Sequence, residues 1–271
     1  MIVNFVDLNK SLVDKVAKAI KYLPFDGVEA ICGDYFKYTE KVSNPVIVSA
    51  SNPDFTMGGG LDALIARNYV YEVEQINREK KNQRIEGVIF TITVNDELKS
   101  NRELVAEALK FALSKTKKNE TVLISGLGTG IGGLDEDDFV WLFLQAVCEK
   151  FGYGWGIKFV KKNSTDFYTG KIKYQAGKWL KQRGAVVSDE DCGVGLHLGK
   201  DFIGAGNYNL PEKIFFCLYE KKDVCNVSSD KIRLKRLLPL VELPQWLGYG
   251  VNGKKYLAKL GKKFNPEKYN P

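Results

Sequence analysis

Residues Pro45 to Ile65 read PVIVSASNPDFTMGGGLDALI and contain the most informative pattern of the chain. It begins with a continuous apolar, β-branched run, which is typical of a strand covered on both faces. It ends with apolar residues at the spacing of a helix. Between the two lie Asn52, Pro53 and three consecutive glycines, residues 58–60. Because glycine loses more conformational entropy on folding than any other residue, three of them after a buried strand need a structural or chemical reason.

The same alternation of strand and helix continues on both sides of this stretch. We expect strands at residues 1–8, 28–34, 45–50, 87–94, 121–128 and 156–160, and helices at 11–22, 61–78, 101–115 and 135–150. Strands alternating with helices of this length predict a three-layer α/β fold, with a mixed or parallel sheet between helices on both faces. Ligands of such sheets bind at the carboxyl ends of the strands, where residues 52–60 are expected to lie.

The chain changes character after about residue 151, where Gly, Lys and Tyr become frequent and helical periodicity weakens. We therefore predict a first domain over residues 1–160 and a smaller mixed or mostly β module over 161–247. The basic segment 248–271 is expected to be a loosely packed or extended tail.

The composition excludes several classes of protein. Hydrophobic residues make up 44% of the 271 residues, but no apolar run is long enough for a transmembrane helix, and the first residues lack the pattern of a secretory signal. Five cysteines without a CxxC pair predict reduced thiols in the cytoplasm rather than a disulfide framework or a zinc site. The single histidine, His197, excludes a metal site that needs two.

The net charge of +7 is unevenly distributed, with most of the excess between residues 156 and 271. A basic surface of this kind can contact nucleic acid or an anionic ligand. It can also be a solvated, lysine-rich face. The sequence lacks a repeat of aromatic and basic residues, which favours the second interpretation.

Two glycine-rich loops follow two of the expected strands. Gly58–Gly60 directly precede a helix, and GLGTGIGG spans residues 126–133, with Thr129 as a hydroxyl donor. Backbone N–H groups at a helix start attract anions, and glycine lets a phosphate approach the main chain. The second loop is not a P-loop, because no GK[ST] follows, and it matches GxGxxG only weakly. One such loop could simply form a tight turn, but two in one sheet favour phosphate binding.

Asp34 ends the second expected strand, directly after Gly33. It could cap a helix or a turn. Its carboxylate could instead accept a hydrogen bond from a ligand amine. The spacing by itself favours the cap.

These three segments, in this order, resemble the macro domain, a family that binds ADP-ribose and its derivatives. The resemblance covers about residues 1–160 and rests on Gly33-Asp34, on VSASNPDFTMGGGLDALI from Val48, and on SGLGTGIGG from Ser125. It implies that Asp34 holds the adenine amine and that Asn52 lies beside the distal ribose. It also implies that the ribose and diphosphate contact Gly58, Gly59, Gly60, Leu61, Gly128, Thr129, Gly130, Ile131 and Gly132.

Some macro domains hydrolyse ADP-ribosyl linkages with a positioned water, which Asn52 and Asp62 could orient here. The alternative for Asp62 is a surface acid in the first helical turn, where the helix dipole favours it. Three features depart from the family pattern. Ser49 replaces its first asparagine, Ile131-Gly132 replaces an aromatic residue, and residues 87–101 lack its usual histidine. Turnover and simple binding or sequestration of a signalling nucleotide therefore both stay open.

The second module loosely resembles an uncharacterised module of rIIB-like phage proteins, which would fit a phage-encoded protein. The matching positions are Cys192, Gly195, Leu196, His197, Asp223, Val224, Asp230, Lys231 and Arg233. His197 is the candidate site residue here, for nucleotide binding or acid–base chemistry. A structural histidine bonded to the backbone is at least as consistent with the sequence.

The sequence therefore predicts a cytoplasmic protein that binds ADP-ribose or a related NAD-derived nucleotide, or an ADP-ribosylated macromolecule. We expect no cofactor, no metal and no membrane contact. The alternative is a non-catalytic reader whose basic C-terminal half docks on nucleic acid or a host protein. In a third hypothesis the second module itself handles NAD around His197.

Overall fold

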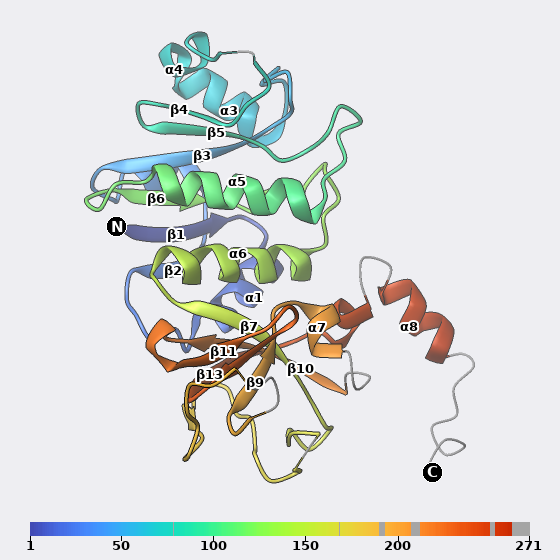
Figure 1. Cartoon of the computed structure of the whole chain (residues 1–271). Helices are drawn as coiled ribbons and strands as arrows, with labels where there is room; N and C mark the ends of the chain where they lie inside the picture. The colour runs from blue at the N-terminus through green and yellow to red at the C-terminus, as the bar shows by residue number, and fades with distance from the viewer. Residues whose placement is uncertain (78, 168, 190–192, 207–211, 250–252, 262–271) are drawn as a thin grey trace. The chain divides into compact units, whose positions relative to one another are not determined.

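The computed structural model describes the chain except residues 78, 168, 190–192, 207–211, 250–252 and 262–271 (Figure 1). It divides into two compact units, Met1–Phe151 (unit 1) and Gly152–Pro271 (unit 2). Strand Gly154–Val160 (β7) belongs to unit 2, because it pairs with Lys213–Tyr219 (β10). The strand expected at 156–160 is thus not the last strand of the first sheet, and the boundary lies at residue 151 rather than 160.

Unit 1 is built on a mixed sheet, which confirms the predicted α/β class. Within the described residues, this sheet has six strands in the order β2-β1-β6-β3-β5-β4, and only the β4–β5 pair is antiparallel. The strands are Ile2–Asp7 (β1), Val28–Cys32 (β2), Pro45–Ser51 (β3), Gln83–Ile85 (β4), Val88–Ile92 (β5) and Thr121–Ile124 (β6). The helices are Lys10–Ile20 (α1), Tyr35–Thr39 (α2), Gly60–Asn68 (α3), Val70–Glu74 (α4), Arg102–Lys115 (α5) and Glu136–Lys150 (α6).

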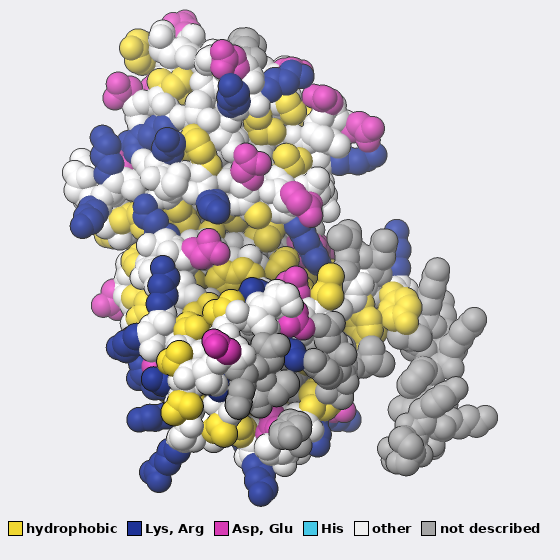
Figure 2. Space-filling model, in the orientation of Figure 1, with side chains coloured by type: hydrophobic (Ala, Val, Ile, Leu, Met, Phe, Trp, Pro, Cys, Tyr) yellow, Lys and Arg dark blue, Asp and Glu magenta, His cyan; other side chains and the backbone are white. Residues whose placement is uncertain are grey.

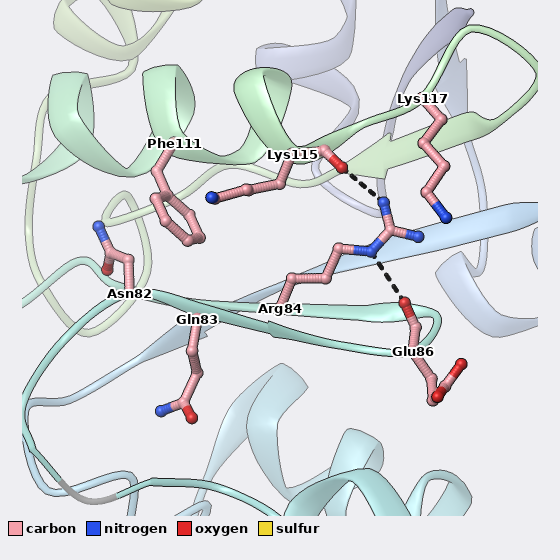
Figure 3. A pocket seen from close by; sticks show the side chains of 7 residues that line it. All are labelled: Asn82, Gln83, Arg84, Glu86, Phe111, Lys115 and Lys117. Carbon is pink, nitrogen blue, oxygen red and sulfur yellow. Dashed lines mark hydrogen bonds between the residues drawn. The ribbon is translucent and has the colours of Figure 1, made fainter.

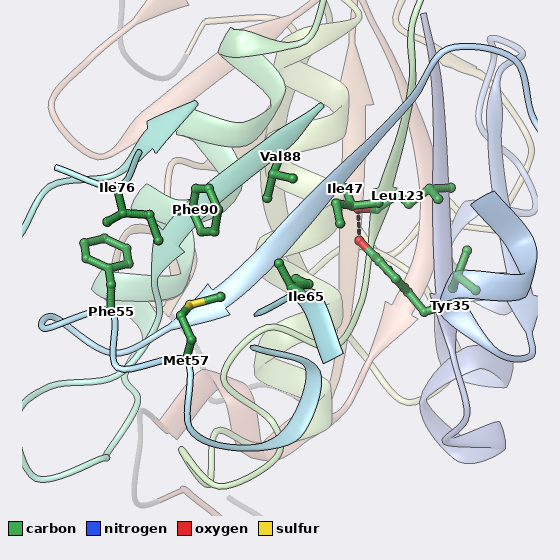
Figure 4. Close-up of a cluster of buried hydrophobic side chains, with 10 residues drawn as sticks. Tyr35, Ile47, Phe55, Met57, Ile65, Ile76, Val88, Phe90 and Leu123 are labelled. Atoms are coloured by element: carbon green, nitrogen blue, oxygen red, sulfur yellow. Dashed lines mark hydrogen bonds between the residues drawn. The ribbon is translucent and has the colours of Figure 1, made fainter. Parts of the chain in front are cut away.

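Helices cover both faces of this sheet. On one face, Phe5 of β1 packs against Phe139 and Phe143 of α6, with ring centroids 5.5 and 5.9 Å apart, and α6 also contacts α1 and α5. On the other face, Tyr35 of α2 and Ile65 of α3 join a buried cluster with side chains of β1, β3, β5 and β6 (Figure 4). Buried side chains therefore hold the helices against both faces of the sheet, which positions the loops that join strands to helices.

The helix predicted over residues 61–78 is two helices, α3 and α4. The break lies at Tyr69, whose backbone is not helical (φ −130°, ψ 53°). The buried face also differs from the predicted apolar stripe, since Asp62 and Ile65 are buried and Leu64 is 43% exposed. An acid can face the sheet because β3 offers it hydroxyl groups rather than apolar side chains. The short helix α2 and the polar strand β4 have no strong periodicity and were not predicted.

Unit 2 is mostly β, as predicted. Within its described residues, an antiparallel sheet has seven strands in the order β11-β12-β9-β7-β10-β13-β8. Besides β7 and β10, these are Leu180–Lys181 (β8), Leu196–Gly199 (β9), Val224–Val227 (β11), Lys231–Leu234 (β12) and Arg236–Leu243 (β13). Its helical segments are Phe202–Gly206 (α7), Lys221–Asp223 (η1), Gln245–Tyr249 (η2) and Gly253–Gly261 (α8).

Part of the expected tail is helical rather than extended. Helix α8 contacts η2, where the Lys254 ammonium lies 4.7 Å from the centre of the Trp246 ring. The rings of Tyr249 and Tyr256 also lie 5.5 Å apart. The rest of the predicted tail, residues 250–252 and 262–271, lies outside the described residues.

One lysine lies among apolar side chains of the second sheet. Lys158 of β7 pairs across the ladder with Phe215 of β10, and its ammonium is 5.6 Å from the centre of the Tyr174 ring. Burial lowers the pKa of Lys158, and the nearby Cys217 and Asp166 only partly oppose this shift. The folded protein therefore favours the neutral amine more than the unfolded chain does.

We expect the free energy of unfolding to rise with pH between the lowered pKa of Lys158 and the ordinary value of 10.5. In that window the unfolded chain holds a proton that the folded protein has released. The stability that the neutral amine contributes is present above pH 10.5 and is lost as the pH falls through the folded-state pKa. Lys158→Met should remove this slope and raise the free energy of unfolding at neutral pH by about 1–2 kcal/mol.

Urea unfolding between neutral pH and about pH 10 measures the effect. Lys162→Met is the matched control, because this neighbouring side chain is exposed, and it should keep the wild-type slope. An unchanged slope in Lys158→Met would contradict the prediction.

Candidate functional site

Five loops leave the first sheet at one edge. The parallel strands β2, β1, β6, β3 and β5 are neighbours in that order, so the residues that follow their carboxyl ends lie along the same edge. The loop Asn52–Gly59 follows β3 and the loop Ser125–Leu134 follows β6, its neighbour. The structure thus brings the two glycine-rich loops to adjacent positions, with Asp34 farther along the edge, after β2.

The loop Asn52–Gly59 is held by its own side chains. Its two buried residues, Phe55 and Met57, have left-handed backbones (φ 48° and 51°), which are unusual for residues other than glycine. The Phe55 ring meets Phe90 of β5 edge-on, with centroids 6.4 Å apart (Figure 4). Backbone strain of this kind persists only where the surroundings enforce it, and it occurs often at functional sites. The buried side chains of Phe55 and Met57 therefore fix the backbone that leads into Gly58–Gly60.

Asn52, a predicted ligand and catalytic residue, has a local partner. Its amide oxygen accepts a hydrogen bond from the Thr56 N–H (3.1 Å), and its amide nitrogen donates to the Thr56 hydroxyl (2.8 Å). The side chain therefore closes the turn between β3 and the glycines. One amide hydrogen is left for a ligand.

Gly58–Gly60 are exposed, as a phosphate-facing segment requires. Gly59 is the N-cap of α3 and provides no side-chain cap. A Cβ at Gly59 or Gly60 would meet no atom within 4 Å. No side chain of the cap residue therefore satisfies the first N–H groups of α3, and such uncapped groups attract anions.

The loop after β6 is tied to the segments that follow β1 and β5. The Gly126 N–H donates to the Asp7 carboxylate at the end of β1 (2.9 Å), and the Ser100 N–H, after β5, donates to the Gly132 carbonyl (2.8 Å). The Thr129 hydroxyl donates back to the Gly126 carbonyl (2.7 Å), so it stabilises the loop instead of pointing to a ligand. Asp7 was not predicted as a site residue. Its only signal was its position as an acid at a strand end.

The tip of this loop faces outward. A Cβ at Gly130 would meet no atom within 4 Å, and Ile131 is 82% exposed. By contrast, Gly128 has a left-handed backbone (φ 76°) and lies against Ser100. The fold therefore requires glycine at position 128, whereas Gly130 is not required by packing and leaves an open surface.

Asp62 is buried beneath the glycines rather than exposed, so the surface alternative is wrong. It is 7% exposed and accepts hydrogen bonds from the hydroxyls of Ser49 and, at 3.2 Å, Ser51. The two hydroxyls are themselves 2.9 Å apart. Burial raises the pKa of Asp62, and the two hydroxyl donors partly oppose this shift. Ser49 departs from the macro-domain pattern in the sequence. In the structure its hydroxyl donates a hydrogen bond to the Asp62 carboxyl.

Asp34 caps α2, as the spacing suggested. Its Oδ1 accepts from the N–H groups of Phe36 (2.9 Å) and Lys37 (3.0 Å). The residue is exposed, and its other carboxylate oxygen makes no hydrogen bond to a described residue. Capping and recognition of a ligand amine are therefore compatible in one side chain.

Some basic residues of unit 2 are exposed, whereas others are buried or paired with acidic side chains. Lys and Arg project from many points of the face in Figure 2, interspersed with acidic side chains. Within the basic segment 231–236, however, Arg233 is 2% exposed and donates a hydrogen bond to the Ser188 hydroxyl (2.7 Å). Arg236 pairs with Glu220 and Asp223. This segment is therefore not a free basic surface, and contact with nucleic acid stays a prediction.

His197 lies on β9, half-buried, opposite Arg233 of β12. Its proposed role in nucleotide chemistry stays a prediction, and the neighbouring Cys192 lies outside the described residues. The cysteines at 32, 148, 217 and 225 are free thiols. No metal-binding cluster of His, Cys, Asp or Glu occurs among the residues that the structure describes.

A cavity of about 550 Å³ lies away from this edge, between β4 and α5 (Figure 3). It is lined by Asn82, Gln83, Arg84, Glu86, Phe111, Lys115 and Lys117. None of the predicted site residues lines it. The candidate site is thus an open edge of loops, and the cavity is a separate feature.

Comparisons with models of protein families and with curated proteins find no match to the chain. In the described part of the chain, no helix has both the length and the apolar character that crossing a membrane requires. The case for a function consequently depends on the geometry of the site and on the sequence motifs.

Proposed function

We propose that unit 1 binds ADP-ribose or a related NAD-derived nucleotide at the carboxyl edge of its sheet, in the manner of a macro domain. The observation that carries this proposal is the pair of glycine-rich loops on the neighbouring strands β3 and β6. Both present open main chain to the same edge. A diphosphate needs several N–H donors that it can approach closely, and two adjacent loops can supply them.

Two further side chains, Asp34 and Asn52, would each contact a different part of the ligand. Asp34 keeps one carboxylate oxygen for the adenine amine while the other oxygen caps α2. Asn52 keeps one amide hydrogen for the distal ribose. The strained support under Gly58–Gly60 agrees with a surface that is built before the ligand arrives, because a preformed site avoids part of the entropic cost of binding.

We also propose that Asp62 acts as the base in hydrolysis of an ADP-ribosyl ester. It takes a proton from a water whose oxygen bonds to the acyl carbon; the bond between the acyl carbon and the ribose oxygen breaks, and the proton passes to that oxygen as it leaves. Burial raises the pKa of Asp62, which makes its carboxylate a stronger base. Ser49 and Ser51 hold the carboxyl in one orientation. It lies in the first turn of α3, directly after the glycines that would contact the ribose.

Titration calorimetry of the full chain with ADP-ribose tests the binding proposal. We expect saturable binding, and about tenfold weaker binding by Asp34→Ser, because a charge-assisted hydrogen bond to the amine is lost. Serine is chosen because it is also a good N-cap, which keeps α2 in place. The absence of heat at millimolar ADP-ribose in the folded protein would exclude the proposal.

A further inference from the structure

The cavity between β4 and α5 has the properties of a second ligand site, independent of the proposed function. Its volume of about 550 Å³ is within the range of small-molecule sites. Strand β4 is the edge strand farthest from β2. The cavity runs along it, from Asn82 beside the carboxyl end of β5 to Glu86 near the amino end of β5, and no residue of the glycine loops lines it.

The floor of the cavity is a fixed ion pair. Arg84 donates to both carboxylate oxygens of Glu120 (2.6 and 2.8 Å) and to the carbonyls of Glu86 (2.9 Å) and Lys115 (2.5 Å; Figure 3). Hydrogen bonds from Arg84 lower the pKa of Glu120 to about 2. Because both charges are matched, neither residue is available to a ligand.

Three further side chains of the lining, those of Asn82, Lys115 and Lys117, can donate hydrogen bonds, whereas the Gln83 amide is bonded to the Asn77 backbone. The Asn82 oxygen accepts from the Ile92 N–H (2.7 Å), which leaves its NH₂ group as the exposed part of the amide. Among the described residues, no carboxylate lies within ion-pair distance of the Lys115 or Lys117 ammonium. Figure 3 shows the Glu86 carboxylate pointing away from Arg84. The cavity thus offers an amide and two ammonium groups as donors, and the Glu86 carboxylate is the one acidic side chain in its lining.

An aromatic ring stands beside these donors. Phe111 of α5 is half-buried in the wall, and the Lys115 ammonium lies 5.4 Å from the ring centre. A flat ligand can stack on such a ring while its anionic group meets the neighbouring ammonium.

We infer that this cavity binds a small organic phosphate that carries a flat ring, of the nucleoside monophosphate class. The ring packs on Phe111, and the phosphate accepts hydrogen bonds from Lys115 and Asn82, which lie beside this ring, while Lys117, on the other side of Arg84, adds positive charge (Figure 3). The pairing of free donors with an aromatic wall, and the neutralised floor below them, select an anion over a cation or an apolar ligand.

Titration of the ¹⁵N-labelled full chain with uridine monophosphate, followed by NMR, tests this inference. We expect saturable shifts of the Asn82, Phe111, Lys115 and Lys117 amides. The double variant Lys115→Met/Lys117→Met should bind at least about tenfold more weakly. Lys110→Met is the matched control, since this exposed lysine of α5 does not line the cavity, and it should bind like the wild type.

Two further arms separate the parts of the ligand. Uridine without phosphate, and inorganic phosphate without a ring, should each bind more weakly than the monophosphate, and Phe111→Leu should weaken the monophosphate but not inorganic phosphate. Equal affinity for phosphate and monophosphate would overturn the role of the ring. Unchanged affinity in the folded double variant would overturn the site. Asp34→Ser should leave these shifts intact, so the result does not depend on ADP-ribose binding.

Discussion

Gly128→Ala should destabilise unit 1 by about 2–4 kcal/mol, whereas Gly130→Ala should change its stability by less than about 0.5 kcal/mol. Gly128 has a left-handed backbone, and a Cβ there would lie 2.3 Å from the Ser100 hydroxyl and 2.8 Å from a methyl group of Val105. Gly130 has neither constraint, because nothing lies within 4 Å of its Cβ position. Strain and overlap therefore act at one glycine of the loop and not at the other.

Urea unfolding, followed by the circular dichroism of both variants and the wild type, measures the difference. The same pair also tests the site. If a diphosphate approaches the loop tip, Gly130→Ala should weaken ADP-ribose binding although the protein is as stable as the wild type. Equal stability of the two variants would contradict the structure of the loop, whereas unchanged binding by Gly130→Ala would contradict only the proposed ligand contact.

Asp62→Asn should lower the rate of hydrolysis of an ADP-ribosyl ester by at least about 100-fold, while ADP-ribose binding persists. An amide can still accept hydrogen bonds from Ser49 and Ser51, so the cluster that anchors α3 to β3 is kept. It cannot take a proton from water. Asp62→Ala is the structural comparison. It leaves two buried hydroxyls without this acceptor, and we expect it to cost about 2–3 kcal/mol of stability.

The pH dependence of stability distinguishes these roles. Burial raises the pKa of Asp62 above its ordinary value of 3.8, so the folded protein binds this proton more tightly than the unfolded chain does. The resulting stability is fully present below pH 3.8 and is lost as the pH rises through the folded-state pKa. Asp62→Asn should remove this decline. If the decline persists, Asp62 is not the buried acid that the structure describes. If it disappears but turnover is unchanged, Asp62 stabilises α3 and is not the base.

Much of the fold could be predicted from local pattern. The apolar run at residues 45–50 and the helical spacing of residues 101–115 indicate a strand and a helix correctly, because these signals depend on neighbours in sequence. The break at Tyr69 and the exposure of Leu64 could not be predicted in this way. They depend on which face of α3 meets the sheet, and the hydroxyls of a different element decide that. The strand at 156–160 was recognised, but its partner β10 lies more than fifty residues later, so its sheet could not be assigned.

The candidate site, like the fold, could be predicted only in part from the sequence. The sequence alone indicates that two glycine-rich loops follow strands of an α/β sheet, because turn residues and strand periodicity are local signals. The adjacency of these loops, the hydrogen bond from one of them to Asp7, and the burial of Asp62 against Ser49 and Ser51 are visible in the tertiary structure alone. The order of strands in a sheet and the burial of a side chain depend on contacts between distant residues. The three glycines at 58–60 could therefore be recognised from the sequence, but the support beneath them could not.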